Sequence, residues 1–292
     1  MKVAWIGVGK MGLPMAGHLL AAGHDVVAYD LVPALVEAAV ARGARSAGTP
    51  AAAARQAEVV FSSIPDDAAL RSAALSDSGL LAGAQPGTIY VDTSTVSAEA
   101  SAEVAAAAAS RSVHYLRVTV SGNNKMAQAK ALTVMASGDR AIYEKCRPLL
   151  ALFGSQQYYV GEAEQARTLK LAVNLMVYAT IAGLAEALAL GRRGGVDWEQ
   201  MLDVMAASAI GSPLLKAKSG ALKARDFSAT FTCLQARKDL GLISGAAAAS
   251  GVPAAVAEIA ARLIEDCIAH DGADEDYAAM IKAVERAALP HS

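Results

Sequence analysis

The stretch MKVAWIGVGKMGLPM, residues 1–15, decides the fold of this chain. Its apolar beginning, Met1–Val8, is typical of a buried strand, and Met11–Ala22 has the composition of a helix. Between them lies a G-x-G-x-x-G string, whose glycines allow a tight turn, close approach of a pyrophosphate and close packing of helix on strand. This order of strand, glycines and helix predicts a dinucleotide site formed by Gly7, Val8, Gly9, Lys10, Met11 and Gly12. The alternative is that the glycines only serve turns.

A carboxylate ends the second predicted strand, Asp25–Asp30. Asp30 follows the last glycine at close to the ~20-residue spacing at which an acid receives the ribose hydroxyls of a dinucleotide. A carboxylate there accepts hydrogen bonds from a free 2′-hydroxyl and repels a 2′-phosphate, and Leu31-Val32-Pro33 brings no arginine to bind that phosphate. We therefore expect NAD rather than NADP, with Asp30 and Leu31 at the ribose. The alternative is that Asp30 caps a turn.

Short apolar runs alternate with alanine-rich helical stretches through the first half of the chain. Such alternation predicts an α/β Rossmann-type domain with a mostly parallel sheet and helices on both faces. The predicted strands after the first two are Glu58–Ile64, Thr88–Asp92, Tyr115–Val120, Leu132–Ala136 and Gln157–Val160, and Leu35–Arg42 is a further predicted helix.

The pattern changes after Gly161. One long helix is predicted from Glu162 to about Arg193, where Gly194-Gly195 stops it, and only helical patterns follow. We predict a dinucleotide-binding domain over 1–161 and an all-helical domain for substrate binding and oligomerisation over 162–292. A helix of about 30 residues spans ~45 Å, so we expect this one to pack also against the first domain or a second subunit.

The composition excludes several classes of protein. Of 292 residues, 54% are hydrophobic and 18% charged, which excludes a disordered chain. A net charge of −2 without a basic block argues against nucleic-acid or anionic-membrane partners. We expect no membrane span and no signal peptide, and hence a cytoplasmic protein. No metal site is expected, because the cysteines and histidines are scattered: Cys146, Cys233, Cys267, His18, His24, His114, His270 and His291.

Four further motifs follow the glycine string in order. They are Asp92-Thr93-Ser94-Thr95-Val96, Val120-Ser121-Gly122, Lys170 with Asn174, and Lys238-Asp239-Leu240. Together with residues 7–15 they resemble the β-hydroxyacid dehydrogenases, which include 3-hydroxyisobutyrate, tartronate semialdehyde and γ-hydroxybutyrate dehydrogenases. The resemblance implies an NAD-dependent oxidoreductase that interconverts a small 3-hydroxy acid and its semialdehyde or oxo acid. It also implies a Rossmann-type domain followed by a helical domain, with the active site in the cleft. The helical domains are expected to pack together in a homodimer or homotetramer.

Lys170 is the predicted general acid/base. Alcohol oxidation needs a base for the hydroxyl proton and carbonyl reduction needs an acid, and a lysine with a lowered pKa can serve both. Asn174 lies four residues on, hence on the same helix face, where it can orient substrate or lysine. The alternative is a solvated lysine and an ordinary polar residue, but the surrounding run Leu169–Met176 is mostly apolar.

Other roles follow from strand ends and from the resemblance. Ser121 and Gly122 end a strand, where ligands bind in open α/β sheets, and the resemblance makes them the carboxylate site. The alternative is an ordinary Ser-Gly turn. The resemblance also places Thr95 beside the nicotinamide and Lys238 in the closed cleft, near substrate and cofactor. The cofactor is expected to be bordered by the end of the third predicted strand, at Ser63, Ile64 and Pro65.

The predicted substrate loop departs from the family pattern. Arg117-Val118-Thr119-Val120 stands where Asp-Ala-Pro-Val is usual, and Asn123, Asn124 and Lys125 replace small residues after the serine. One hypothesis is that Lys125 or Arg117, with Asn123 nearby, receives a second anionic or polar group of a larger substrate. The alternative is that Arg117 is structural and Lys125 is solvated.

Two other functions stay open at this stage. Imine reductases share this architecture, so the fold does not require carbonyl chemistry, although their catalytic centre generally lacks the lysine. A protein that binds NAD as a sensor or scaffold without turnover is the third possibility, which the Lys170 and Asn174 pair disfavours.

Overall fold

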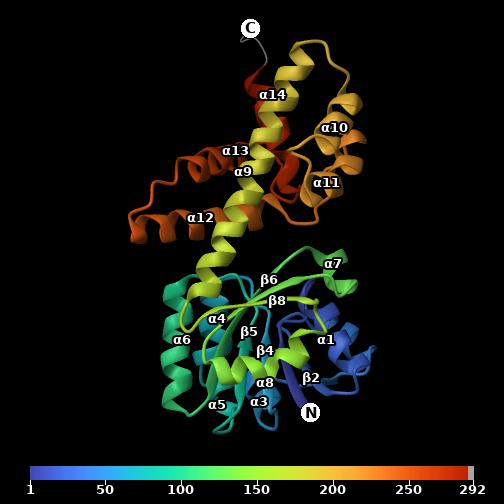
Figure 1. The fold of residues 1–292 in the computed structure, drawn as a ribbon. Helices are drawn as coiled ribbons and strands as arrows, with labels where there is room; N and C mark the ends of the chain where they lie inside the picture. Colours follow the sequence, from blue (N-terminus) through green and yellow to red (C-terminus); the bar gives the residue numbers. More distant parts are fainter. Residues whose placement is uncertain (289–292) are drawn as a thin grey trace. The chain divides into compact units, whose positions relative to one another are not determined.

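The computed structural model describes residues 1–288, which form two compact units, residues 1–170 and the described residues from 171 onward. The first unit contains one eight-stranded sheet with helices on both of its faces (Figure 1). The described part of the second unit is helical. The predicted fold class, a Rossmann-type α/β domain followed by an all-α domain, is confirmed.

The sheet has the strand order β3-β2-β1-β4-β5-β6-β7-β8. Its strands are β1 (Lys2–Ile6), β2 (Asp25–Tyr29), β3 (Arg45–Ser46), β4 (Val59–Ser62), β5 (Ile89–Asp92), β6 (His114–Ser121), β7 (Thr133–Ser137) and β8 (Gln156–Gly161). The seven strands predicted from the sequence end within two residues of these bounds. The two-residue β3 has no apolar pattern, and the sequence did not predict it.

All neighbouring strands are parallel except β6 and β7, which are antiparallel. A parallel crossover needs about a dozen residues or more, usually with a full helix. The chain between Ser121 and Thr133 contains only the five-residue α7 (Asn124–Gln128), so it returns as an antiparallel strand. The predicted substrate loop is this connection.

Alternate residues of each strand supply two cores, one on each face of the sheet. In β1, Val3 and Trp5 join one core while Ala4 and Ile6 join the other. The first core is covered by α1 (Gly12–Ala21), α2 (Pro33–Val40), α7 and α8 (Arg140–Leu150). The second is covered by α3 (Pro50–Ala54), α4 (Asp67–Leu75), α5 (Leu80–Gly83) and α6 (Ala98–Ser110).

The long helix α9 (Gln165–Arg193) begins three residues after its predicted start and crosses the division between the units. The second unit continues with α10 (Trp198–Ala207), α11 (Pro213–Lys223), α12 (Cys233–Ser250), α13 (Ala255–Ala269), the 3₁₀ helix η1 (Tyr277–Ala279) and α14 (Met280–Ala287). Its core includes α9 residues at helical spacing, among them Tyr178, Ile181, Ala185 and Leu188.

Among the described residues, α9 is one helix that is long and apolar enough to cross a membrane. Its most apolar window is 39% buried within the structure. A core helix of a globular unit has the same length and composition, so these two properties do not assign α9 to a membrane.

Candidate functional site

The glycine loop between β1 and α1 has the geometry that its sequence predicts. Gly7 has φ +88°, and a Cβ there would lie 2.4 Å from the Ser63 carbonyl oxygen. A Cβ at Gly12 would lie 2.0 Å from the Gly7 carbonyl oxygen, which accepts a hydrogen bond from Trp5 Nε1 at 3.1 Å. Only glycine fits both positions. These contacts hold the loop against its neighbouring strands. At Gly9, by contrast, no described atom outside the two adjacent residues lies within 4 Å of a Cβ position.

This loop presents backbone amides that a phosphate can use. In residues 1–288, no acceptor receives the amide hydrogens of Gly9 or Lys10. The Val8 amide, by contrast, donates to Asp30 Oδ2 at 2.9 Å. Unpaired amides beside the start of a helix favour an anion, so the loop fits the pyrophosphate of a dinucleotide.

The Asp30 carboxylate joins the glycine loop to the end of β2. Its Oδ2 atom accepts from Val8 and its Oδ1 atom accepts from the Val32 amide at 3.0 Å. A carboxylate offers about four lone-pair positions, so each oxygen can accept a further hydrogen bond from a ribose hydroxyl. Leu31 beside it is 83% exposed.

The ends of β4 and β5 lie beside the same loop. The Ser63 carbonyl approaches Gly7, and the Ile64 amide donates to Ser94 Oγ at 2.9 Å. Pro65 and the partly exposed Thr95 come next in the two segments. The structure thus brings the predicted residues Ser63 and Ile64 to the glycine loop, with Ser94 joined to them by a hydrogen bond.

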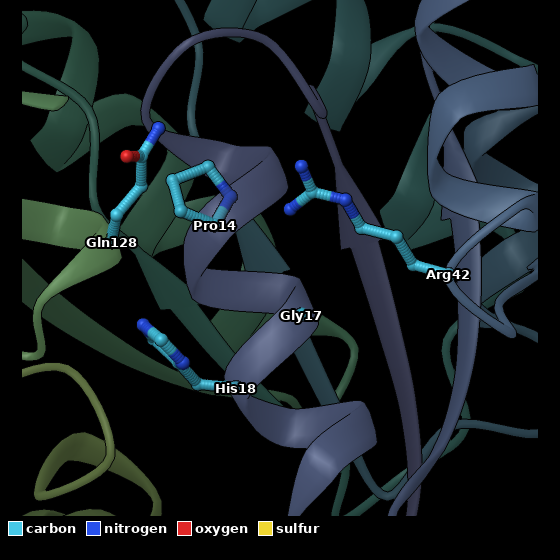
Figure 2. Close-up of a pocket in the computed structure, with 5 residues that line it drawn as sticks. All are labelled: Pro14, Gly17, His18, Arg42 and Gln128. Atoms are coloured by element: carbon cyan, nitrogen blue, oxygen red, sulfur yellow. The ribbon is translucent and has the colours of Figure 1, made fainter. Parts of the chain in front are cut away.

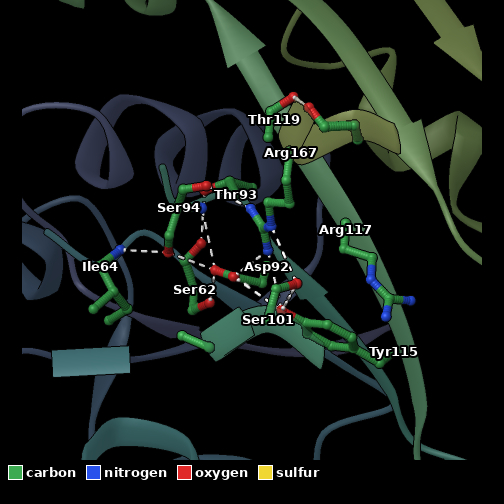
Figure 3. A network of polar contacts seen from close by, with 12 residues as sticks. Ser62, Ile64, Asp92, Thr93, Ser94, Ser101, Tyr115, Arg117, Thr119 and Arg167 are labelled. Atoms are coloured by element: carbon green, nitrogen blue, oxygen red, sulfur yellow. Dashed lines mark hydrogen bonds and ion pairs between the residues drawn. The ribbon is translucent and has the colours of Figure 1, made fainter. Parts of the chain in front are cut away.

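Behind these strand ends lies a buried ion pair between Asp92 and Arg167, which are 0% and 1% exposed (Figure 3). Arg167 also donates to the Ser94 carbonyl oxygen, to the Tyr115 hydroxyl at 3.0 Å and to Ser101 Oγ at 3.3 Å. Asp92 Oδ1 accepts from Ser62 Oγ at 2.6 Å and from the Ser94 amide at 3.1 Å. All these groups belong to the first unit.

The protonation states of this network follow from burial and charge. Burial by itself would lower the pKa of Arg167. Asp92, Tyr115 and Glu164 together raise it by more, so the net pKa lies above the ordinary arginine value. Burial also raises the pKa of the Tyr115 hydroxyl, and Asp92 adds to the rise. Arg167 is therefore charged, and Tyr115 keeps the proton that it donates to Asp92 Oδ2 at 3.1 Å.

The predicted substrate loop begins where β6 ends at Ser121. Gly122 has φ +137°, and the Asn123 side chain accepts a hydrogen bond from the Met126 amide at 3.0 Å. Asn123 Oδ1 therefore caps α7. Lys125 on the same short helix is exposed.

Arg117 lies earlier on β6 and has a carboxylate partner. Its guanidinium forms an ion pair with Glu164 at 2.5 Å and lies 4.9 Å from the centre of the Tyr115 ring. These contacts support the structural interpretation of Arg117, and they leave Lys125 as the better candidate for a second anionic group.

Lys170 and Asn174 lie one turn apart on α9, as their spacing predicts. Asn174 is 9% exposed, and its Nδ2 atom donates to Asp239 Oδ2 at 2.7 Å. Tyr178, one turn later, donates to the same oxygen at 3.2 Å, and Lys238 Nζ lies 2.6 Å from Asp239 Oδ1. A buried carboxylate thus holds Asn174 and Lys238 together in the second unit.

The charged residues Asp92, Arg167 and Asp239 of these networks were not predicted as site residues. Asp92 and Asp239 stand inside motifs quoted above, and a charged residue inside an apolar strand or helix is the signal that could have indicated a buried role. Arg167 had no such signal, because its partners come from β5, β6 and α6.

A surface hollow of about 470 Å³ lies over α1, lined by Pro14, Gly17, His18, Arg42 and Gln128 (Figure 2). None of these is a predicted site residue. In residues 1–288 there is no group of three or more His, Cys, Asp or Glu side chains placed to hold a metal ion, and His291 lies outside the described residues.

Two protein families match successive parts of the chain. Residues 2–161 match the NAD-binding domain of 6-phosphogluconate dehydrogenase, and residues 165–284 match the NAD-binding domain of NADP-dependent 3-hydroxyisobutyrate dehydrogenase. These matches make the first unit an NAD(P)-binding domain.

Similar proteins cover nearly the whole chain. The 2-(hydroxymethyl)glutarate dehydrogenase of Eubacterium barkeri is 33% identical over 98% of this chain and 95% of that protein. The NAD-dependent L-serine dehydrogenase of Pseudomonas aeruginosa is 33% identical over 96% of this chain and 97% of that protein.

Solved structures give the same picture. The 3-hydroxyisobutyrate dehydrogenase of Mycobacterium tuberculosis, solved with L-serine, is 29% identical with a TM-score of 0.86 over 97% of this chain and 98% of that one. An imine reductase from Pseudomonas sp. is more distant, at 19% identity and a TM-score of 0.62, and shares the fold alone. The family predicted from the sequence motifs is confirmed: the chain belongs to the β-hydroxyacid dehydrogenases, oxidoreductases of hydroxy acids.

Proposed function

We propose that this protein is an NAD-dependent dehydrogenase that interconverts a small 3-hydroxy acid and its semialdehyde or oxo acid. The observation that carries the proposal is the arrangement on α9, where Lys170 lies one turn before an asparagine whose amide is fixed by a buried carboxylate. Family membership supports the reaction class, and the Asp30 geometry supports the choice of NAD.

The nicotinamide cofactor, when bound, accepts or gives the hydride. Gly9 and Lys10 would hold its pyrophosphate through their backbone amides. Asp30 would accept hydrogen bonds from both ribose hydroxyls, since each of its oxygens has a single donor among residues 1–288. A 2′-phosphate would bring a second anion against this carboxylate, which is the physical reason to propose NAD. Ser63, Ile64, Pro65 and Thr95 would border the cofactor.

Lys170 is proposed to move the proton. As a neutral amine it takes the proton from the substrate hydroxyl during oxidation, and as an ammonium it returns that proton during reduction. Asn174 is proposed to orient the reacting groups. Because Asp239 is an acceptor, the asparagine must turn its Nδ2 atom toward it, which leaves Oδ1 to accept from a hydroxyl or an ammonium.

Ser121 and Gly122 are proposed to bind the substrate carboxylate at the end of β6. Lys125, one turn into the substrate loop, is proposed to receive a second anionic group when the substrate has one. The dicarboxylate named for the Eubacterium barkeri relative makes this a specific substrate to test, beside L-serine and 3-hydroxyisobutyrate. Lys238 is proposed to reach substrate and cofactor from α12.

The proton-transfer role is tested by Lys170→Ala. We expect turnover of the best of these three substrates to fall by ~10⁴, the upper range for loss of a general acid or base, with NADH binding retained in a fluorescence titration. Asn174→Ala should lower kcat by a smaller factor. Undiminished turnover by the Lys170 variant would falsify the mechanism.

The cofactor proposal is tested by kcat/KM with NAD and NADP. The protein should prefer NAD by tenfold or more, and Asp30→Ser should narrow that ratio. Asp25→Asn is the matched control, because it removes a carboxylate from β2 that pairs with Arg45 and has no proposed contact with the cofactor. A native preference for NADP would overturn the assignment.

The same assays separate the other functions. Cyclic imines consumed with NADH in preference to semialdehydes would favour an imine reductase, and NADH binding with no turnover on any substrate would favour a sensor.

We also propose the two domains 1–161 and 162–292, a cytoplasmic location, and a homodimer or homotetramer formed through the helical domain. Exposed Met176 and Leu190 on α9 support the oligomer, which light scattering would measure.

A further inference from the structure

We infer that Arg167 is a positioning residue that sets the place of Lys170 relative to the cofactor-side ends of β4 and β5. The inference rests on the proposed function, because it assumes that Lys170 moves the proton. Arg167 and Lys170 are three residues apart on α9, so they belong to the same turn and lie on neighbouring parts of one helix face.

Arg167 is fixed by four different partners, three of them in β5, β6 and α6 and one, Ser94, in the segment after β5. Its Nη2 atom contacts Asp92 Oδ2 and the Tyr115 hydroxyl, its Nη1 atom donates to the Ser94 carbonyl, and its Nε atom donates to Ser101 Oγ. Figure 3 shows the guanidinium pointing into this group of side chains. A planar guanidinium with donors in several directions can satisfy all four partners at once, whereas the ammonium of a lysine cannot match this geometry.

The network continues from Arg167 to the cofactor side. Asp92 accepts hydrogen bonds from the amide and hydroxyl of Ser94, and the Ser94 hydroxyl oxygen accepts from the Ile64 amide. Ile64 follows Ser63, whose carbonyl lies against the glycine loop. One chain of polar contacts therefore runs from the helix turn of Lys170 to the segment proposed to border the nicotinamide cofactor.

Further contacts hold the start of α9 and the residues just before it to the sheet. Ser137 Oγ donates to the Ala163 carbonyl at 2.7 Å and accepts from the Ala166 amide at 3.1 Å. Thr119 Oγ1 donates to the Ala166 carbonyl at 3.1 Å, and Arg117 pairs with Glu164. These side chains come from β6 and β7. Arg167 is the member of this group that reaches β5, and so the one that joins Lys170 to the cofactor side.

A buried ion pair is a costly way to stabilise a fold, since apolar side chains of similar volume often do as well or better. What the pair does supply is fixed geometry, because every donor and acceptor has a defined direction. Displacing a reacting group by about 1 Å can cost ~10² in rate even when binding is unchanged. We therefore expect loss of the Arg167 contacts to lower kcat while substrate and cofactor binding change little.

The test compares Arg167→Lys with the native protein on the best of the three hydroxy acids. We expect kcat to fall about 100-fold, while KM and the Kd for NADH change less than threefold. The isotope effect on kcat with substrate deuterated at the carbinol carbon should rise, because the hydride step becomes more limiting. Phe153→Leu is the control for lost stability, because Phe153 is buried in the core on the other face of the sheet. Its kcat should stay native.

Ser94→Ala is the second variant, for use if Arg167→Lys does not fold. It cuts the link between Asp92 and Ile64 and leaves Arg167 with its charge partner, so kcat should fall about tenfold with a higher isotope effect. Native kcat in either folded variant would overturn the inference. Lys170→Ala is run alongside: if it keeps turnover, the proposed function fails, whereas an inactive Lys170→Ala with native Arg167→Lys rejects only the positioning role.

Discussion

Two buried carboxylates, one in each unit, hold side chains of the same helix in different ways. Asp92 is 0% exposed and binds Arg167 near the start of α9, and Asp239 is 1% exposed and binds Asn174 further along. Each also has a cationic partner. For Asp92 that partner is Arg167 itself, with a side chain 1% exposed, whereas the Lys238 side chain beside Asp239 is 30% exposed.

The two ion pairs differ in whether water can reach the charged groups. The pair in the first unit is closed to water, so its atoms keep their partners for as long as the unit is folded. The cation in the second unit reaches solvent, so an anionic ligand can contact Lys238 while it stays beside Asp239. The first arrangement suits the fixing of a backbone turn, and the second suits a ligand-binding group.

The largest expected effect comes from breaking the closed pair. Asp92→Asn leaves the Arg167 charge buried without a counter-charge, so we expect the free energy of unfolding of the first unit to fall by about 3–5 kcal/mol. Urea unfolding followed by circular dichroism measures it. Asp25→Asn, which opens an exposed pair with Arg45, is the control and should cost less than about 1 kcal/mol. Equal losses in the two variants would contradict the distinction.

The corresponding change in the second unit should cost less. Asp239→Asn removes the counter-charge of a lysine that reaches water, and its amide oxygen can still accept from Asn174 or Tyr178. We expect a loss of about 1–2 kcal/mol in the same urea experiment. A larger loss than that of Asp92→Asn would reverse the order of the two sites. Because the new amide can also donate, Asn174 can bind it with its own amide turned around, so kcat should also fall, by about tenfold.

Salt should separate the two arrangements further. A double-mutant cycle with Lys238→Met and Asp239→Asn measures the coupling energy of that pair, which we expect near 1 kcal/mol at 0.05 M NaCl. At 1 M NaCl the Debye length is about 3 Å, so the coupling of a partly exposed pair should decrease. A coupling energy that does not change with salt would show that Lys238 is as enclosed as Arg167.

The smallest effect is expected at a surface pair of the second unit. Hydrogen bonding to Arg225 holds the pKa of Glu285 below its ordinary value of 4.5, against a rise from burial. Such a carboxylate stabilises the fold fully at pH values above 4.5. It loses that stabilisation as the pH falls through its pKa in the folded protein, which is the lower of the two. Glu285→Gln should therefore cost about 0.5 kcal/mol at pH 7, and the difference should vanish in strong acid. A difference that grows on acidification would contradict the sign.

The sequence was sufficient for most of the fold because its periodic signals are local. The apolar run ending at Ile6 and the glycines from Gly7 to Gly12 predict strand, turn and helix without reference to any distant residue. Strand β3 has no such signal, since Arg45 and Ser46 pair with β2 only because the chain passes its edge. The direction of β7 also depended on how far the short connection after Ser121 can reach.

In the candidate site, too, some residues could be predicted from the local sequence and others could not. Asp30 could be proposed from spacing, and Lys170 with Asn174 from helix periodicity and resemblance, because each signal lies within one or two elements. The partners of Arg117 and Arg167 could not, because Glu164, Asp92 and Ser101 are distant in sequence and meet only in the folded unit. The second-anion hypothesis for Arg117 was weakened by this tertiary contact.

The sequence by itself determined the Rossmann-type architecture, the glycine loop with its acidic partner and the position of Lys170 on a long helix. Local backbone sterics and helix periodicity act between residues near in sequence, and both can be seen in the sequence. The tertiary structure decided which polar groups are buried together: Asp92 with Arg167, and Asp239 with Asn174. Burial and hydrogen-bond geometry depend on the packing of distant elements, and they decide which charges are fixed and which reach solvent.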